Sequence, residues 1–384
     1  MRGLRWTTAG ESHGPALIGV LEGMPSGLEL SVERIDAELA RRQRGYGRGG
    51  RMKLESDRVQ VLSGWRAGLT IGAPLALRIE NRDATLERLP VPTSPRPGHA
   101  DLAGCQKHES HDPRAVLERA SARETAMRVA LGAAARQVLE SFGVELFAHV
   151  VELGGLAARA DAFEAAGEMR AEIRDASEFA GLDVELEPRW RERVDEAKAL
   201  GDSLGGVFEV RVLGLPPGLG GYSSPYERLT SRLGGALLSI PAMKGVEFGL
   251  GFEAARRLGS AVHDAIVPAA AGSEAPWGKF ARSTNRSGGL EGGMTTGEAL
   301  VARVAMKPIS TLRRGVPTVD FESGEVVDST WQRSDVTSVP AASVAGEAVL
   351  ALELASVFLE RFAGDSLAQV RRSYSDYRDS LRKL

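Results

Sequence analysis

The strongest constraint on the fold is a segment near residues 341–363 that is apolar on most of its faces. Its sequence, AASVAGEAVLALELASVFLERFA, predicts a helix, and a helix without a broad polar face has to be buried. No uninterrupted apolar run in the chain reaches the ~18 residues that a membrane span needs. The segment therefore predicts a central helix in a protein core.

Other helices and strands follow one another without the regular alternation of a βαβ fold. Ser31 caps a predicted helix, and a second long helix is predicted from Ser121, with a capping box to Glu124 and a stop at Gly143. Strands are predicted at 16–23, 58–64, 69–81, 206–218 and 300–308. This combination indicates the α+β class. No G-x-G-x-x-G motif follows a strand, so we expect no Rossmann dinucleotide site.

Length and composition are those of a soluble globular protein: 384 residues, 43% hydrophobic and 26% charged. We expect one domain over 1–384, because no Ser- or Pro-rich linker divides the chain, with 151–200 forming solvated helices without visible chemistry. Cys105 is the only cysteine, which excludes an intrachain disulfide or a thiolate metal cluster. The N-terminus lacks an apolar signal region. These features predict a cytoplasmic location.

The stretch RRQRGYGRGGRMK at 41–53 permits two interpretations. It could be a disordered arm that binds RNA, or part of a folded pocket for a small, highly charged anion. The net charge of −3 disfavours general nucleic-acid binding, whose affinity comes from a basic field. We therefore favour the pocket, and expect neither nucleic acid nor membrane as a partner.

Two histidines occur in tight glycine-bounded loops. GESHG places Ser12 and His13 before a predicted strand, and RPGHAD places His99 between Arg96 and Asp101. Either loop alone would be interpreted as an ordinary polar turn. Together they indicate acid/base chemistry, because imidazole titrates near neutral pH. Neither loop has the spacing of a metal site, and no metal is expected.

Further loops carry groups suited to phosphate. RASARE (119–124) combines a hydroxyl and two guanidiniums at the start of a predicted helix. These groups can bind a phosphate, and the hydroxyl can also cap the helix. The glycine-rich run 286–298 leads through a strand into KPIST (307–311). In RSD (333–335), the spacing puts an arginine and a carboxylate on one face of an extended segment, as a plain ion pair or as a base.

Taken together, these motifs resemble those of the chorismate synthase family. They are GESHG, RRQRGYGRGGRMKLESD, RPGHAD, RASARETAMR, AMKGVEFG, GGLEGGMTTGE, KPIST and RSD, in that family's order. The resemblance implies a β-α-β sandwich, with helices between antiparallel sheets, and a homotetramer. It also implies a lyase that removes phosphate and a ring proton from 5-enolpyruvylshikimate 3-phosphate to give chorismate, the last step of the shikimate pathway to aromatic amino acids.

The same resemblance implies a need for reduced FMN without net redox change, with NADPH or an external flavin reductase as the source of electrons. It implies that His13 protonates or stabilises the reduced flavin, that His99 helps phosphate to leave, and that Asp335 maintains the flavin as proton acceptor, with Ser12 and Ser121 as relay hydroxyls. The FMN-binding residues that it implies are Arg119, Ala120, Ser121, Ala242, Gly292, Lys307, Pro308, Ile309, Ser310, Thr311 and Arg333.

The arginines that the resemblance places around the phosphate and carboxylates of the substrate are Arg42, Arg48, Arg51, Arg96 and Arg123. Planar guanidinium suits both groups, and Arg42 and Arg48 are also linked with NADPH. Arg41, Arg44 and Lys53 are expected to be solvated charge. One departure is Pro241, which stands where many members carry an amide side chain. A homologue that binds flavin without turnover is the remaining alternative, although His13, His99 and Asp335 are intact.

Overall fold

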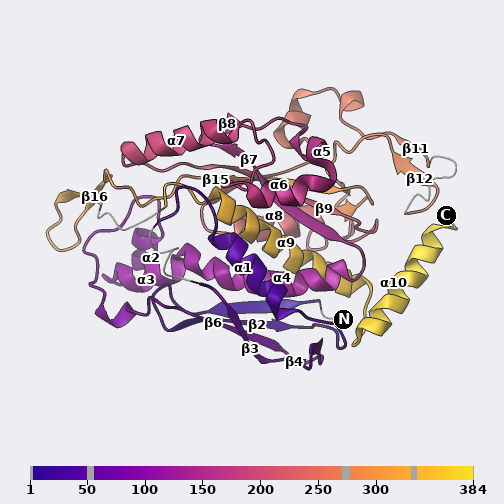
Figure 1. The fold of residues 1–384 in the computed structure, drawn as a ribbon, viewed down its shortest axis with the longest axis horizontal. Coiled ribbons are helices and arrows are strands. Elements are labelled where there is room, and N and C mark those ends of the chain that lie inside the picture. The colour runs from indigo at the N-terminus through magenta and orange to yellow at the C-terminus, as the bar shows by residue number, and fades with distance from the viewer. Residues whose placement is uncertain (1–2, 50–55, 270–276, 330–334, 384) are drawn as a thin grey trace.

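Two antiparallel sheets enclose a layer of helices in the computed structural model, which describes residues 3–49, 56–269, 277–329 and 335–383 (Figure 1). The lower sheet has the strand order β1-β2-β6-β3. Its strands are β1 (Arg5–Ala9), β2 (Ala16–Glu22), β6 (Leu75–Glu80) and β3 (Val59–Ser63). Leu17 lies opposite Ile79 and Leu21 opposite Leu75, and all four side chains are buried on the face toward the helices.

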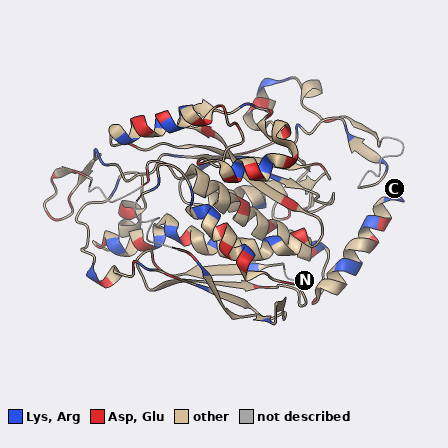
Figure 2. Cartoon of the chain, viewed as in Figure 1, with Lys and Arg blue, Asp and Glu red and all other residues tan. Residues whose placement is uncertain are grey.

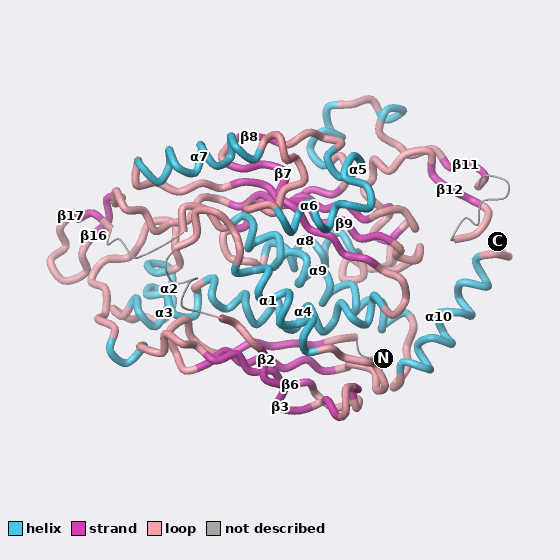
Figure 3. Tube along the Cα trace, in the orientation of Figure 1, coloured by secondary structure: helices cyan, strands magenta, loops and turns pink. Residues whose placement is uncertain are grey.

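The upper sheet has the order β10-β15-β9-β7-β8 and is also antiparallel throughout. Its strands are β10 (Met243–Phe248), β15 (Leu300–Met306), β9 (Gly206–Leu213), β7 (Glu145–Leu153) and β8 (Leu156–Ala157). Phe208 and Val304 are paired and fully buried toward the helices. The two sheets thus leave the middle layer covered on both sides (Figure 3).

The middle layer contains α1 (Val32–Gln43), α4 (Thr125–Glu140), α8 (Leu229–Leu238) and α9 (Val339–Arg361). Helix α9 is the predicted central helix. By length and composition it could cross a membrane, but 94% of its apolar window is buried inside the protein, as in a core helix. Small residues bring α4 and α9 close together: a Cβ added at Gly132 would lie 2.5 Å from the Cβ of Ala348.

The remaining elements surround this sandwich. They are β4 (Trp65–Arg66), β5 (Leu69–Thr70), η2 (Leu86–Arg88), α2 (Asp101–Lys107), α3 (Pro113–Ala120), η3 (Ala122–Glu124), α5 (Ala162–Ala166), η4 (Gly167–Met169), α6 (Arg170–Ala176), α7 (Glu187–Ala199), η5 (Gly251–Arg256), η6 (Gly259–Ala261), β11 (Ile266–Pro268), β12 (Phe280–Arg282), β13 (Leu290–Glu291), β14 (Met294–Thr295), β16 (Pro317–Val319), β17 (Val326–Asp328) and α10 (Leu367–Leu381). Figure 2 shows charges of both signs along α7 and α10.

The predicted α+β sandwich is confirmed, with local differences. The strand predicted at 69–81 is divided into β5 and β6, because Pro74 has no N–H for a ladder and directly precedes β6. The helices within 151–200 are not solvated throughout, since Trp190 and Val194 of α7 are fully buried. The helix expected from Ser121 begins instead as the short 3₁₀ turn η3, and α4 starts at Thr125.

Candidate active site

The GESHG loop joins β1 to β2 and places His13 against α3. Nδ1 of His13 lies 2.9 Å from Oε1 and 3.1 Å from Oε2 of Glu118, and the backbone N–H of His13 donates to Oε2 at 2.8 Å. On the other side of the ring, Nε2 lies 3.8 Å from Oδ2 of Asp83. Burial works to raise the pKa of Glu118, but hydrogen bonds from His13 and Arg114 outweigh it and the pKa is lowered. Glu118 is therefore an ionised carboxylate inside the protein.

The two predicted relay hydroxyls lie together beside this pair. Ser121 Oγ donates to Ser12 Oγ at 3.2 Å, and Ser12 is 2% exposed. The capping box predicted for Ser121 is wrong: its Oγ accepts from the N–H of Arg123, and the Glu124 carboxylate binds Thr8 and Arg128 instead of returning to Ser121. The reason is that α3 ends directly before Ser121, so only a tight 3₁₀ turn fits between the two helices.

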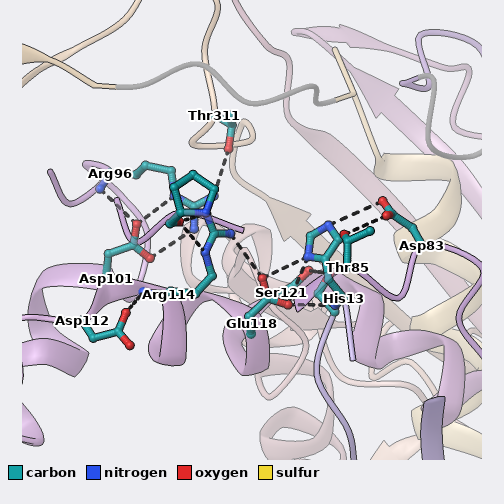
Figure 4. Close-up of polar contacts among 12 residues, drawn as sticks. His13, Asp83, Thr85, Arg96, Asp101, Asp112, Arg114, Glu118, Ser121 and Thr311 are labelled. Atoms are coloured by element: carbon teal, nitrogen blue, oxygen red, sulfur yellow. Dashed lines mark hydrogen bonds and ion pairs between the residues drawn. The ribbon is translucent and has the colours of Figure 1, made fainter. Parts of the chain in front are cut away.

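His99 forms a second histidine–carboxylate pair within its own loop. Its Nδ1 lies 2.5 Å from Oδ1 of Asp101, which is 1% exposed, and 3.0 Å from Nη2 of Arg96. Burial works to raise the pKa of Asp101, but hydrogen bonds from His99 and Arg96 lower it well below its usual range. Figure 4 shows Arg114 and Glu118 of α3 between Asp101 and His13.

The KPIST loop lies against the His99 loop. Lys307 Nζ donates to the carbonyl of Gly98 at 2.9 Å, and Arg96 Nη1 donates to Thr311 Oγ1 at 3.4 Å. The N–H of Lys307 donates to the carbonyl of Ala242 at 3.0 Å, so the backbone next to Pro241 joins the same region. Burial, together with the charge of Lys244, lowers the pKa of Lys307.

A buried arginine cluster adjoins the GESHG loop. Arg123 donates to Asp57 Oδ2 at 2.7 Å and to Asn81 Oδ1 at 3.0 Å, and the amide of Asn81 donates to the carbonyls of Glu11 and Gly14. The guanidinium of Arg42 binds the η3 turn, which contains Arg123. It donates to Thr125 Oγ1 at 3.1 Å and to the carbonyl of Ala122 at 3.0 Å. Arg42, Arg123 and the His13 loop thus form one connected region.

Arg48 and Asp335 extend this region toward α9. Nη1 of Arg48 lies 2.9 Å from Oδ2 of Asp335, whose Oδ1 accepts from the N–H of Gly49 at 2.6 Å. Ser338 Oγ also donates to Asp335. Burial lowers the pKa of Arg48, and burial with the charges of Arg48 and Arg123 lowers that of Arg42 to about 10. Both remain cationic at neutral pH.

The described residues 41–49 of the RRQRGYGRGGRMK stretch are folded against the rest of the protein, which argues against the interpretation as a disordered RNA-binding arm. Arg41 was expected to be solvated, but its Nη2 donates to the buried Glu347 of α9 at 2.7 Å. Arg51, Lys53 and Arg333 lie outside the described residues, so their predicted roles stay predictions.

Three residues predicted to contact FMN have structural roles in the described chain. Arg119 donates to the carbonyls of Thr8 and Gly10 and so ties α3 to the β1 strand, while Ala120 ends α3. Gly292 lies in the β13–β14 turn with φ +59°, and this turn binds α8 through the carbonyl of Gly293. Their flavin contacts remain predictions.

Four site residues were not assigned a role from the sequence: Asp57, Asn81, Asp101 and Glu118. Asp101 stands two residues from His99 and Asp57 lies in the LESD motif, so their sequence positions offered a weak signal. Asn81 and Glu118 offered none, because each reaches the GESHG loop from a distant part of the chain.

Comparison with known proteins identifies the family. A family model described as chorismate synthase matches residues 4–359. The chain belongs to the chorismate synthase family. Chorismate synthases of Geobacter metallireducens and Desulforudis audaxviator are each 50% identical over 397 residues, covering 99% of this chain and 100% and 98% of theirs. A crystal structure of chorismate synthase, 41% identical, superimposes with a TM-score of 0.81 over 100% of both chains. The protein is therefore an enzyme, a lyase.

The donors of this chorismate synthase site suit an anionic ligand. Three guanidiniums, those of Arg42, Arg48 and Arg123, gather beside the carboxylates of Asp57 and Asp335. Nη1 of Arg42 is buried and has no hydrogen-bond partner among the residues that the structure describes. A buried donor of this kind is costly unless a ligand completes its bonds. Over the same residues, no group of three or more His, Cys, Asp or Glu side chains could hold a metal ion.

Proposed function

We propose that this enzyme eliminates phosphate and a ring proton, in anti geometry, from 5-enolpyruvylshikimate 3-phosphate to give chorismate, the last step of the shikimate pathway. The observation that carries the proposal is a pair of buried arginines beside the His13 loop. Arg123 donates to Asn81, whose amide donates to the carbonyl of Gly14, and Arg42 donates to the carbonyl of the residue before Arg123. This arrangement puts binding groups for a multiply charged anion next to an acid/base residue. In this proposal the whole chain, 1–384, acts as one domain.

Within this proposal the arginines bind and the histidines move protons. Arg42, Arg48, Arg51, Arg96 and Arg123 hold the phosphate and the carboxylates of the substrate. His99 donates a proton to the departing phosphate, and its ring is kept in place by the buried Asp101. Asp335 would keep the bound flavin able to accept the proton that leaves the substrate ring. The hydroxyls of Ser12 and Ser121, which are hydrogen-bonded to each other, would relay that proton. His13 holds a proton beside the bound cofactor.

The chain's groups also fit reduced FMN. Bound reduced FMN would supply an electron transiently and take it back, so that the reaction has no net redox change. The residues that would bind it are those that the family resemblance implies: Arg119, Ala120, Ser121, Ala242, Gly292, Lys307 to Thr311, and Arg333. Pro241 has no amide side chain to offer, but the backbone of Ala242 is already joined to Lys307. NADPH, bound at Arg42 and Arg48 or used by an external flavin reductase, is the ultimate reductant.

We further propose a cytoplasmic homotetramer that uses neither nucleic acid nor membrane as partner. Four large apolar side chains are exposed on the single chain within 252–269 and 277–280: Phe252, Leu258, Ile266 and Phe280. Such a surface is typical of a protein–protein contact. Light scattering coupled to gel filtration measures the assembly, and a monomer at micromolar concentration would contradict this part of the proposal.

Anaerobic incubation with the enolpyruvyl substrate and chemically reduced FMN tests the function. We expect equal amounts of phosphate and chorismate. No product from folded, flavin-bound protein would overturn the proposal. Product with oxidised FMN and no reductant would overturn the cofactor requirement alone.

A further inference from the structure

The His13 ring is held by a carboxylate that comes from a different element of the fold. Glu118 lies in the last turn of α3 and uses both oxygens on His13, one toward the ring and one toward the backbone N–H. Arg114, one helical turn earlier, donates to the same carboxylate at 3.3 Å. Glu118 is 2% exposed, so its interaction with His13 is shielded from solvent.

A buried carboxylate makes strong hydrogen bonds only as an acceptor. An ionised Glu118 therefore requires the proton of a neutral His13 ring to be on Nδ1, which leaves Nε2 as the basic nitrogen. Nε2 lies on the opposite side of the ring, toward Asp83, and the side chain of His13 is 19% exposed. The ring is thus held at Nδ1 by Glu118, while Nε2 faces Asp83 and the side chain is partly exposed.

We propose that Glu118 is a positioning residue for His13: it fixes the ring orientation and keeps a proton on Nδ1, so that Nε2 is presented to the ligand. This inference rests on the proposed function for the identity of that ligand, but not for the orientation itself. Asp101 makes a similar contact to His99, but it belongs to the same short loop and also binds Arg96. Glu118 belongs to α3, so it can be replaced without changing the sequence of the loop that carries His13.

The test compares Glu118→Gln and Glu118→Asp with the wild-type enzyme. Glu118→Gln keeps the shape and removes the charge, so we expect kcat to fall about 10-fold or more while KM and FMN affinity stay within about twofold. Glu118→Asp retains the charge and should recover part of the lost kcat. The exposed Glu192 of α7 provides the matched control. Glu192→Gln should behave as wild type.

A second readout does not depend on turnover. In the wild-type enzyme, NMR should show a downfield, slowly exchanging imidazole N–H resonance, assigned to His13 by its loss in His13→Gln. In Glu118→Gln it should move upfield or exchange out. An unchanged resonance with unchanged kcat would overturn the inference, and so would equal losses of kcat, FMN affinity and thermal stability, which indicate only a structural role. If the wild-type enzyme forms no chorismate, the proposed function fails, while the resonance still tests the role of Glu118.

Discussion

The carboxylate of Asp335 lies 2.9 Å from the guanidinium of Arg48 and joins the glycine-rich segment after α1 to the segment that leads into α9. The N–H of Gly49 and the hydroxyl of Ser338 bind the same carboxylate. A segment with the composition of an RNA-binding arm is therefore attached at this point to the central helix of the core.

Replacing Asp335 separates its proposed chemical role from this attachment. Asp335→Asn keeps an oxygen for Gly49 N–H but loses the charge, so we expect kcat to fall about 100-fold or more with FMN affinity nearly unchanged. Anaerobic chorismate formation and a flavin titration measure the two quantities. Ser338→Ala removes one hydrogen bond to Asp335 but no charge, so it should lower kcat far less. A near-normal rate in Asp335→Asn would remove its proposed role.

Arg42→Lys tests substrate binding. Lysine keeps the charge but lacks the planar fork with which Arg42 binds Thr125 and Ala122. We expect KM for the substrate to rise about 10-fold or more, equivalent to about 1.4 kcal/mol, with a smaller change in kcat. Arg34→Lys, at an exposed position on the same helix, is the control and should leave KM unchanged. Equal KM values for both variants would contradict the assignment of Arg42.

The contact between α4 and α9 limits the size of residue 132. A methyl group at Gly132 would overlap Ala348, so Gly132→Ala should lower the free energy of unfolding by about 1–3 kcal/mol. Gly235 in α8 has open space at its Cβ position, and Gly235→Ala should raise the same quantity by about 0.5–1 kcal/mol. Urea unfolding at a fixed protein concentration measures both. Changes of the same sign would argue against this packing.

Glu209 should make stability depend on acid pH. Burial works to raise its pKa, but hydrogen bonds and charges of His149 and Arg211 lower it to about 2, from 4.5. Because the folded-state pKa is depressed, the stabilisation is complete above about pH 4.5 and is lost as pH falls toward 2.

In Glu209→Gln this contribution is absent. The difference in unfolding free energy between wild type and variant should therefore be larger at about pH 6 than at about pH 3, by an amount on the order of 1–3 kcal/mol. Urea unfolding at both pH values gives this difference. A difference that stays constant, or that grows as pH falls, would contradict the pairing of Glu209 with His149 and Arg211.

Local patterns predicted much of the secondary structure. The helix after Ser31 begins with the expected cap, in which the Ser31 side chain accepts from the N–H of Arg34. The strands at 16–23 and 300–308 appear as β2 and β15, because alternation of buried and exposed residues depends only on neighbours along the chain. The predicted start of α4 was wrong, because α3 ends directly before Ser121 and leaves no room for the predicted cap.

By itself, the sequence determined that a helix near 341–363 would be buried, that the fold would be α+β, and to which family the motifs belong. Only the tertiary structure decided which partner each buried carboxylate has. Glu118 contacts His13, Asp57 accepts from Arg123, and Glu347 accepts from Arg41. Periodicity and capping follow from short-range geometry, which the chain encodes locally. The partner of a buried charge depends on which distant segments the folded layers bring together, and desolvation then makes that partner indispensable.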